Sequence, residues 1–266
     1  MGALMLGLSG IAGAQSVTLR IRPTVGDTLR MQMEQHFEFL HDSSTVDQAF
    51  ARPMTATVSV CTRSVVVSSS AKGTELESVT DSVTIIPEIA RALPLFANTE
   101  KALRGRKVRL WVAHDGGISI IDGTKSASDG APLGAQMQMP AMLPKTPVSV
   151  GETWTRSVRV PVSATHSTSG LVRVTLRLDS LGQEGNLAYI SMKGSFSHAR
   201  TKGDPGTPND STAGTLIGGM VINQRLGWMT ESTAVISLDS TVRPAKGAAP
   251  VRVRMKVTQS LRALSP

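Results

Sequence analysis

Residues 29–40 read LRMQMEQHFEFL, and apolar and polar side chains alternate along almost the whole stretch. The odd-numbered residues from 29 to 39 are apolar, with Gln35 as the exception. The even-numbered residues from 30 to 38 are all polar. Successive side chains of a β-strand point to opposite faces. The stretch therefore predicts a strand with one face on a core and the other in water, as is typical of antiparallel sheets.

The same alternation returns at residues 172–178 and 251–257, and turn sequences such as Asp115-Gly116-Gly117 separate the predicted strands. Two segments depart from it. Residues 88–104 have a helical composition and end at Gly105, a suitable C-cap, and residues 126–144 read as a loop or short helix. We predict a mainly β fold: a large curved antiparallel sheet or open half-barrel from two similar halves, with one or two short helical segments on its concave side.

Composition agrees with a folded β protein. The 266 residues are 40% hydrophobic, 18% charged and only 3% aromatic, with a net charge of +8. A disordered chain is disfavoured by this balance, and the single cysteine, Cys61, cannot form an intramolecular disulfide. The scarcity of aromatic residues leaves little bulk for two separate cores.

A weak internal repeat suggests how the chain is organised. PTVGDTL at residues 23–29 returns as PVSVGETW at residues 147–154, each copy placing a glycine turn before a predicted strand. We predict a single β domain over 15–266, with two halves, about 15–143 and 144–266, that share one core. The alternative is chance similarity between two glycine turns.

The N-terminus suggests export. Residues 1–14 carry no charge, and Ala12 and Ala14 stand in the A-x-A spacing of a signal-peptidase site. Signal peptides usually begin with cations, whereas the first cation here is Arg20. We predict a signal peptide over 1–14, truncated at its start, and a periplasmic or secreted protein. The alternative is an apolar N-terminus on a cytosolic domain.

The segment PKTPVSVGETW, at residues 144–154, resembles the P-x-x-P-V-x-V-G-[DE]-x-W segment of an uncharacterised family of exported bacterial β-rich proteins. That family is a domain of unknown function, so the resemblance implies export and a β fold but no catalytic residues. Its architecture is similar in outline to that of periplasmic lipoprotein carriers, an unclosed barrel around an apolar cavity. Such likeness in fold says little about function.

No enzymatic motif stands out. The histidines are dispersed apart from His36 and His41, which would face opposite ways on one strand, and no zinc-ligand pattern occurs. There is neither a nucleophile elbow nor a nucleotide-binding glycine loop. We therefore expect no cofactor, no metal and no catalytic residues. A hydrolase is the less favoured alternative, since its Ser, His and carboxylate would be assembled only in three dimensions.

The positive charge admits two interpretations. Arg252, Arg254 and Lys256 fall on the polar face of one predicted strand. Stacking aromatics of the kind that single-stranded nucleic acids need are nearly absent beside them, so we expect no nucleic-acid partner. One hypothesis is an envelope structural or interaction protein whose basic outer face binds an anionic envelope component. The other is a solvated face that protects the sheet from aggregation.

The leading hypothesis concerns methionine. Flexible Met side chains suit adaptable apolar grooves, and three of them lie in the segment at residues 126–144, while Phe96 and Leu95 lie in the other non-strand segment. We predict a monomeric, non-enzymatic binding or carrier protein for an apolar or lipid-like molecule. The same side chains would otherwise only fill the core, and Trp154 would only anchor its strand. The candidate cavity-lining residues are Met137, Met139, Met142, Phe96, Leu95 and Trp154.

Overall fold

The computed structural model describes residues 16–41, 54–87, 100–122, 142–161, 169–199, 211–242 and 251–264. Thirteen strands and one 3-10 helix, η5 (Gln183–Gly185), lie within them. The strands are β1 (Ser16–Val17), β2 (Thr28–His41), β3 (Met54–Ser70), β4 (Gly73–Pro87), β5 (Lys107–Ala113), β6 (Ile118–Asp122), β7 (Val148–Ser149), β8 (Thr153–Pro161), β9 (Ser169–Gly182), β10 (Leu187–Ala199), β11 (Ser211–Asn223), β12 (Trp228–Val242) and β13 (Val251–Leu264).

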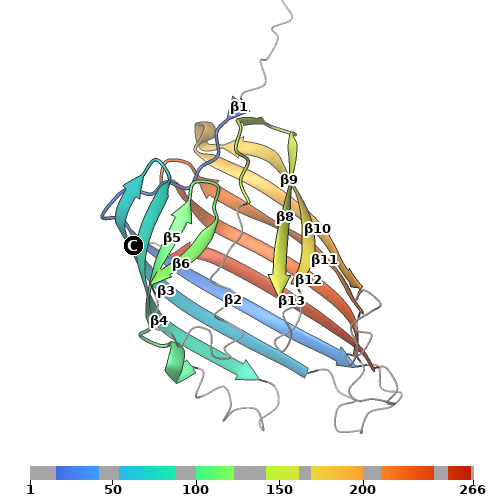
Figure 1. Ribbon diagram of the computed structural model, residues 1–266. Helices are drawn as coiled ribbons and strands as arrows, with labels where there is room; N and C mark the ends of the chain where they lie inside the picture. The colour runs from blue at the N-terminus through green and yellow to red at the C-terminus, as the bar shows by residue number, and fades with distance from the viewer. Residues whose placement is uncertain are drawn as a thin grey trace, which may run out of the picture.

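Eleven of these strands form one antiparallel sheet in the order β6-β5-β4-β3-β2-β13-β12-β11-β10-β9-β8, and β1 pairs with β7 separately. Strands β2 to β6 follow one another from the middle of the sheet to one edge. Strands β8 to β13 then run from the opposite edge back to the middle, where β13 pairs with β2. The sheet curves into a half-barrel (Figure 1). It is not closed into a barrel, because β6 and β8 form its two edges. The predicted curved antiparallel sheet is confirmed.

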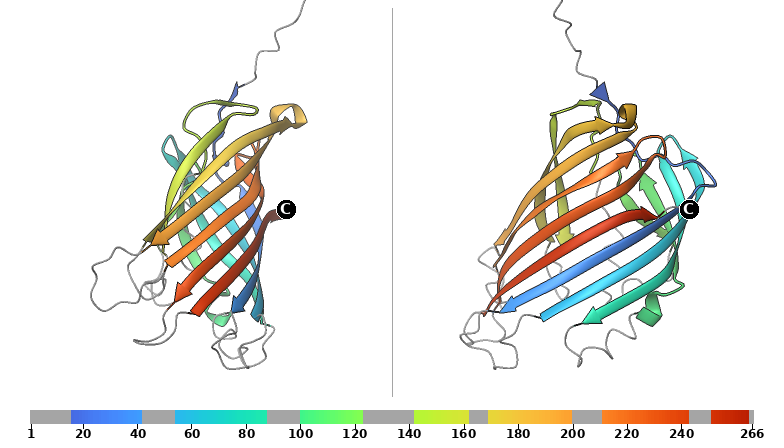
Figure 2. Two further views of the ribbon diagram at one scale, coloured as in Figure 1. Left: turned by 90° about the vertical axis from the view of Figure 1, so that its right-hand side faces the viewer. Right: turned by 180° about the vertical axis from the view of Figure 1, so that it is seen from behind.

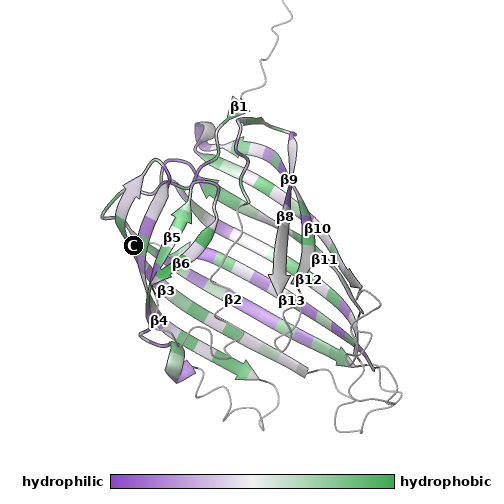
Figure 3. Cartoon of the chain, viewed as in Figure 1, coloured by the Kyte–Doolittle hydropathy of each residue, from purple (hydrophilic) through white to green (hydrophobic). Residues whose placement is uncertain are grey.

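The alternation in the sequence sets the two faces of the sheet. In β2 the odd-numbered side chains face the concave side, where Met31 is 7% exposed, while Arg30 and Glu34 are exposed on the outer side. Figure 3 shows the resulting alternation of apolar and polar bands along the strands. Apolar side chains line the inside of the half-barrel for this reason.

Glycines in β11 allow neighbouring strands to approach closely. A Cβ built on Gly218 would lie 2.1 Å from the carbonyl oxygen of Thr233 in β12, and one built on Gly214 would lie 2.4 Å from the Phe196 ring in β10. Glycine within a strand marks such close approaches and sheet bends. These two positions help the sheet to curve as the side and rear views show (Figure 2).

The main core fills one end of the half-barrel. Leu19 and Ile21, which follow β1, pack there with side chains from both walls, including Val112 of β5 and Ile222 of β11. Leu176 and Leu178 of β9 are completely buried in the same cluster. This end of the half-barrel is therefore packed with side chains.

A smaller core lies under a helical turn at residues 100–103. Leu103 is 7% exposed and packs with Val58 and Val60 of β3 and with Val83 and Ile85 of β4, all on the concave side. Gly105 follows the turn at φ 73°, as a C-capping glycine requires. One of the expected helical segments thus lies partly within the described residues, on the side predicted.

The two copies of the repeated sequence form the same turn. Gly26 and Gly151 have φ values of 91° and 88°. In the first copy the Thr24 amide donates to the Asp27 carboxylate at 3.0 Å. In the second copy the Ser149 amide donates to the Glu152 carboxylate at 2.9 Å. The division of the chain into two halves stays a prediction.

Candidate functional site

Residues Met142 and Leu143 form a strap across the open side of the half-barrel. Both backbone amides donate to the carbonyl oxygen of Asp115, in the β5–β6 turn, at 3.0 and 2.9 Å. From β8, the Trp154 indole donates to the Met142 carbonyl at 2.8 Å, and the Arg156 guanidinium donates to the Leu143 carbonyl. The strap thereby links the two edges of the sheet, which do not pair directly.

Two of the predicted site residues therefore meet at this strap. Trp154 is half-buried against the main core, with its indole bound to the backbone of Met142. The other four candidates, Met137, Met139, Phe96 and Leu95, lie outside the described residues. Their role in lining a cavity stays a prediction.

A small cavity lies beside the strap. Its volume is about 40 Å³, and Met142, Leu143, Met220 and Trp228 are among its lining residues. Pockets for small organic ligands measure roughly 300–1,000 Å³, and a cavity needs about 10–15 Å³ to hold one water molecule. Met142 therefore lines a cavity that is too small for a lipid, and a lipid-sized ligand would need another part of the concave face.

That other part is a surface of two adjoining rows of side chains farther along the strands. Each row crosses six strands from β2 to β9 through paired positions. Together they form what we call the concave apolar surface. Its first row is Phe39, Met255, Leu238, Gly214, Phe196 and Val172, and its second row is Phe37, Val257, Ile236, Leu216, Gly194 and Val174.

The concave apolar surface is less buried than the packed end of the half-barrel. All six residues of its first row are only half-buried, and so are Phe37, Ile236 and Leu216 in the second. The rings of Phe37 and Phe39 stack with their centroids 6.4 Å apart. Contiguous apolar surface that a fold leaves incompletely covered commonly marks a binding site.

A pair of amides borders this surface. The next row begins with Gln35 and Gln259, which are joined by a 2.9 Å hydrogen bond from Nε2 of Gln35 to Oε1 of Gln259. It continues through Ala234 of β12 and Gly218 of β11. Gln35 is only 4% exposed, yet its Oε1 has no hydrogen-bond partner. A buried polar atom without a partner is costly, so a hydrogen-bond donor that reached this oxygen would be favourable.

The predicted basic stripe is extensively paired. Arg252 and Arg254 lie 2.9 and 3.4 Å from Asp239 Oδ1. The hydrogen bond from Arg252 lowers the pKa of the Asp239 carboxyl below its ordinary value, and the charges of both arginines act in the same direction. Asp239 on the outer face therefore offsets part of the charge of these two arginines that an anionic partner would meet.

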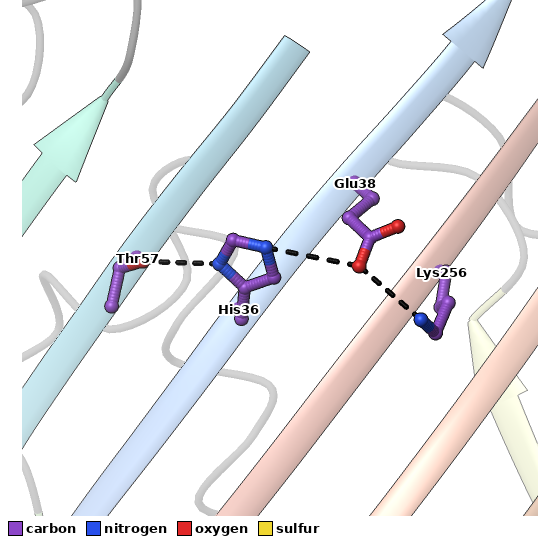
Figure 4. A network of polar contacts seen from close by, with 4 residues as sticks. All are labelled: His36, Glu38, Thr57 and Lys256. Carbon is purple, nitrogen blue, oxygen red and sulfur yellow. Dashed lines mark hydrogen bonds and ion pairs between the residues drawn. The ribbon is translucent and has the colours of Figure 1, made fainter. Parts of the chain in front are cut away.

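Lys256 belongs to a second polar network on the same face (Figure 4). Its Nζ lies 3.3 Å from Glu38 Oε1, and the same oxygen lies 3.8 Å from His36 Nε2. The other ring nitrogen of His36 is 3.1 Å from the Thr57 hydroxyl. These contacts link three neighbouring strands, β3, β2 and β13, on the outer face of the sheet.

The His114–Asp115 pair and the other potential metal ligands do not form a metal-binding arrangement among the described residues. Asp115, next to His114, accepts a hydrogen bond from the Gly117 amide at 3.3 Å, the expected turn interaction. Within the described ranges, no group of three or more His, Cys, Asp or Glu side chains could hold a metal ion.

None of the helical residues described forms a segment long and apolar enough to cross a membrane.

The sequence predicts several of the strands that form the concave apolar surface, but it does not indicate that their apolar residues form a binding site. Phe37, Phe39 and Met255 read only as the apolar faces of two strands. The available signal was the pair of odd-position glutamines, Gln35 and Gln259, which interrupt these apolar series. The missing information was the register that aligns them on adjacent strands.

Comparison with known proteins adds little. No known protein family matches the sequence, and no curated protein does either. Among solved structures, DynF from the dynemicin biosynthesis pathway of Micromonospora chersina aligns with 99% of this chain and 94% of its own. Its sequence identity is 8% and its TM-score 0.19, too low to carry any argument. The open curved sheet is compatible with a binding protein, and the family resemblance stays a prediction.

Proposed function

We propose that this protein is an exported, non-enzymatic binding or carrier protein that holds an apolar or lipid-like molecule against the concave apolar surface. The supporting observation is the contrast in burial along the same strands. Leu176 of β9 and Ile190 of β10 are buried at the packed end. Farther along the same two strands, Val172 and Phe196 on the concave apolar surface are half-buried. Covering half-buried apolar side chains contributes about 25 cal/mol per Å² removed from water.

The amide pair at Gln35 and Gln259 supports a ligand with a polar end. A purely apolar ligand would leave Gln35 Oε1 without a partner, whereas a hydroxyl, an amide or a protonated carboxyl group on the ligand could donate to it. The acyl portion would then extend along Phe37 and Phe39 toward β12 and β11. A lipid-like amphiphile matches this combination better than a hydrocarbon does.

A matched pair of variants on β12 tests this proposal. Leu238→Asn changes the concave apolar surface with little change in side-chain shape, and Val235→Asn changes an outer-face position that is 37% exposed. Binding of a fluorescent fatty acid is the measurement. We expect Leu238→Asn to weaken binding about five- to tenfold, the equivalent of roughly 1 kcal/mol of lost apolar contact.

The control variant should bind as the parent protein does, and both should retain the circular dichroism of the parent. Native mass spectrometry provides the second measurement, because a carrier purified from its host should retain a bound lipid. A purified protein of ligand-free mass that also fails to bind the fatty acid would overturn the proposal, as would equal binding by the two variants.

A further inference from the structure

A basic hollow on the outer face of the sheet is a second candidate site. It has a volume of about 570 Å³, and its lining includes Arg30 of β2, Arg63 of β3 and Lys107 of β5, with Glu77 of β4 as its one acid. The outer face on which it lies is the one seen from behind in Figure 2. The hollow is on the opposite side of the sheet from the concave apolar surface.

The register places these cations in one line. Arg30 pairs directly with Arg63, Arg63 pairs with Val79, and Val79 pairs with Lys107. Like charges directly opposite each other on neighbouring strands destabilise a sheet. The Arg30–Arg63 pair is therefore an arrangement that folding alone does not favour, and an anion between the two guanidinium groups would relieve it.

Neighbouring acids offset this charge only in part. Arg63 lies 3.5 Å from Asp81, with both side chains more than 40% exposed, and exposed pairs of this kind contribute little. Glu75 is engaged by Arg109 at 3.4 Å. Among the ion pairs of the described residues, none includes Arg30 or Lys107. The hollow thus differs from the stripe at Arg252 and Arg254, which shares Asp239.

We propose that the basic hollow binds a phosphate group, held between the guanidinium groups of Arg30 and Arg63 with the Lys107 ammonium beside it. Arginine presents paired N–H donors that match two oxygens of a phosphate, and lysine adds a point charge. A phosphate carries more charge than a single carboxylate, which suits a site of three cations. The volume leaves room for an organic group on the phosphate, so the group could belong to a soluble phosphomonoester or to a lipid headgroup.

The test uses inorganic phosphate as its probe, with binding measured by calorimetry on the full chain. We expect saturable binding that weakens about fivefold in Arg30→Gln and in Lys107→Gln, as loss of an exposed charge contact predicts. The matched control is Arg252→Gln, which removes the same charge from the same face and should leave the affinity unchanged within about twofold. Added NaCl should weaken binding because it screens exposed charges.

A second arm distinguishes the two sources of the phosphate. Binding to vesicles of phosphatidylglycerol and phosphatidylcholine that is lost in Arg30→Gln would identify a lipid headgroup, whereas binding of inorganic phosphate alone would identify a soluble ligand. Melting curves verify the fold, and Arg30→Gln should melt no lower than the parent because it removes the like-charge pair. Absence of both kinds of binding, or an equal loss in Arg252→Gln, would overturn the proposal and leave the fatty-acid site untouched.

Discussion

Replacing Trp154 by Phe should release the strap at Met142 and Leu143 while preserving most of the aromatic packing. The lost interaction is the 2.8 Å hydrogen bond from the indole to the Met142 carbonyl. A hydrogen bond of this kind contributes about 0.5–1.5 kcal/mol, and the smaller ring forfeits some apolar contact in a half-buried position. We expect a total loss of about 1–2 kcal/mol in the free energy of unfolding.

Two measurements on the same variant separate a local from a global effect. The urea midpoint should fall by roughly 0.5 M, since the slope of unfolding free energy against urea is about 3 kcal/mol per M or slightly more for a chain of this size. The amides of Met142 and Leu143, which donate to Asp115, should exchange with solvent up to about tenfold faster. Amides in the middle of β12 should change only as much as the global stability does.

Trp111→Phe is the matched control, because Trp111 is also half-buried but lies on the outer face of β5, away from the strap. It should leave exchange at Met142 and Leu143 unchanged. Identical exchange at these two amides in Trp154→Phe and in the parent protein would refute the role given to the indole. So would an equal acceleration in Trp111→Phe.

Three further changes probe the fold. Gly26→Ala and Gly151→Ala should each lower the unfolding free energy by about 1–2 kcal/mol in urea titrations, since both turns require a positive φ, and very different losses would contradict the equivalence of the turns. Gly218→Ala should destabilise by at least about 2 kcal/mol because its Cβ would collide with a backbone oxygen of β12, and a melting temperature equal to that of the parent would contradict this. Arg252→Gln should raise the pKa of Asp239 toward 3.8 in a carboxyl NMR titration. In the parent protein the lowered folded-state pKa stabilises the fold at pH values above the unfolded-state pKa, and this stabilisation is lost as the pH falls through the folded-state pKa. The variant should therefore lose less stability on acidification than the parent does.

The sequence was sufficient for the sheet because its signal is local. Alternation at residues 29–39 and 251–257 identifies strands whatever their partners are, and a glycine such as Gly105 identifies the end of a helical turn through its own backbone preference. The order of the strands is a different matter. That β13 returns to pair with β2, a contact between residues more than 200 positions apart, is not visible in either strand alone.

The candidate sites depend on that register. Arg30 and Arg63 each look like an ordinary outward-facing cation, and their unfavourable opposition appears only once β2 and β3 are aligned. Likewise the series from Phe39 to Val172 consists of unremarkable apolar positions until six strands bring them into one row. The methionine-based prediction relied on composition within non-strand segments, and of its methionines only Met142 falls among the described residues, at the strap.

The central claim is that an acyl chain lies along the concave apolar surface, and paramagnetic broadening tests it most directly. A stearic acid carrying a nitroxide would be added to protein with methyl-labelled Ile, Leu, Val and Met. We predict stronger broadening of the methyl signals of Leu216, Leu238 and Met255 than of the outer-face methyls of Ile217 and Val235, because the effect falls steeply with distance. Stronger broadening of the outer-face methyls, or no broadening at any of the five, would contradict the account.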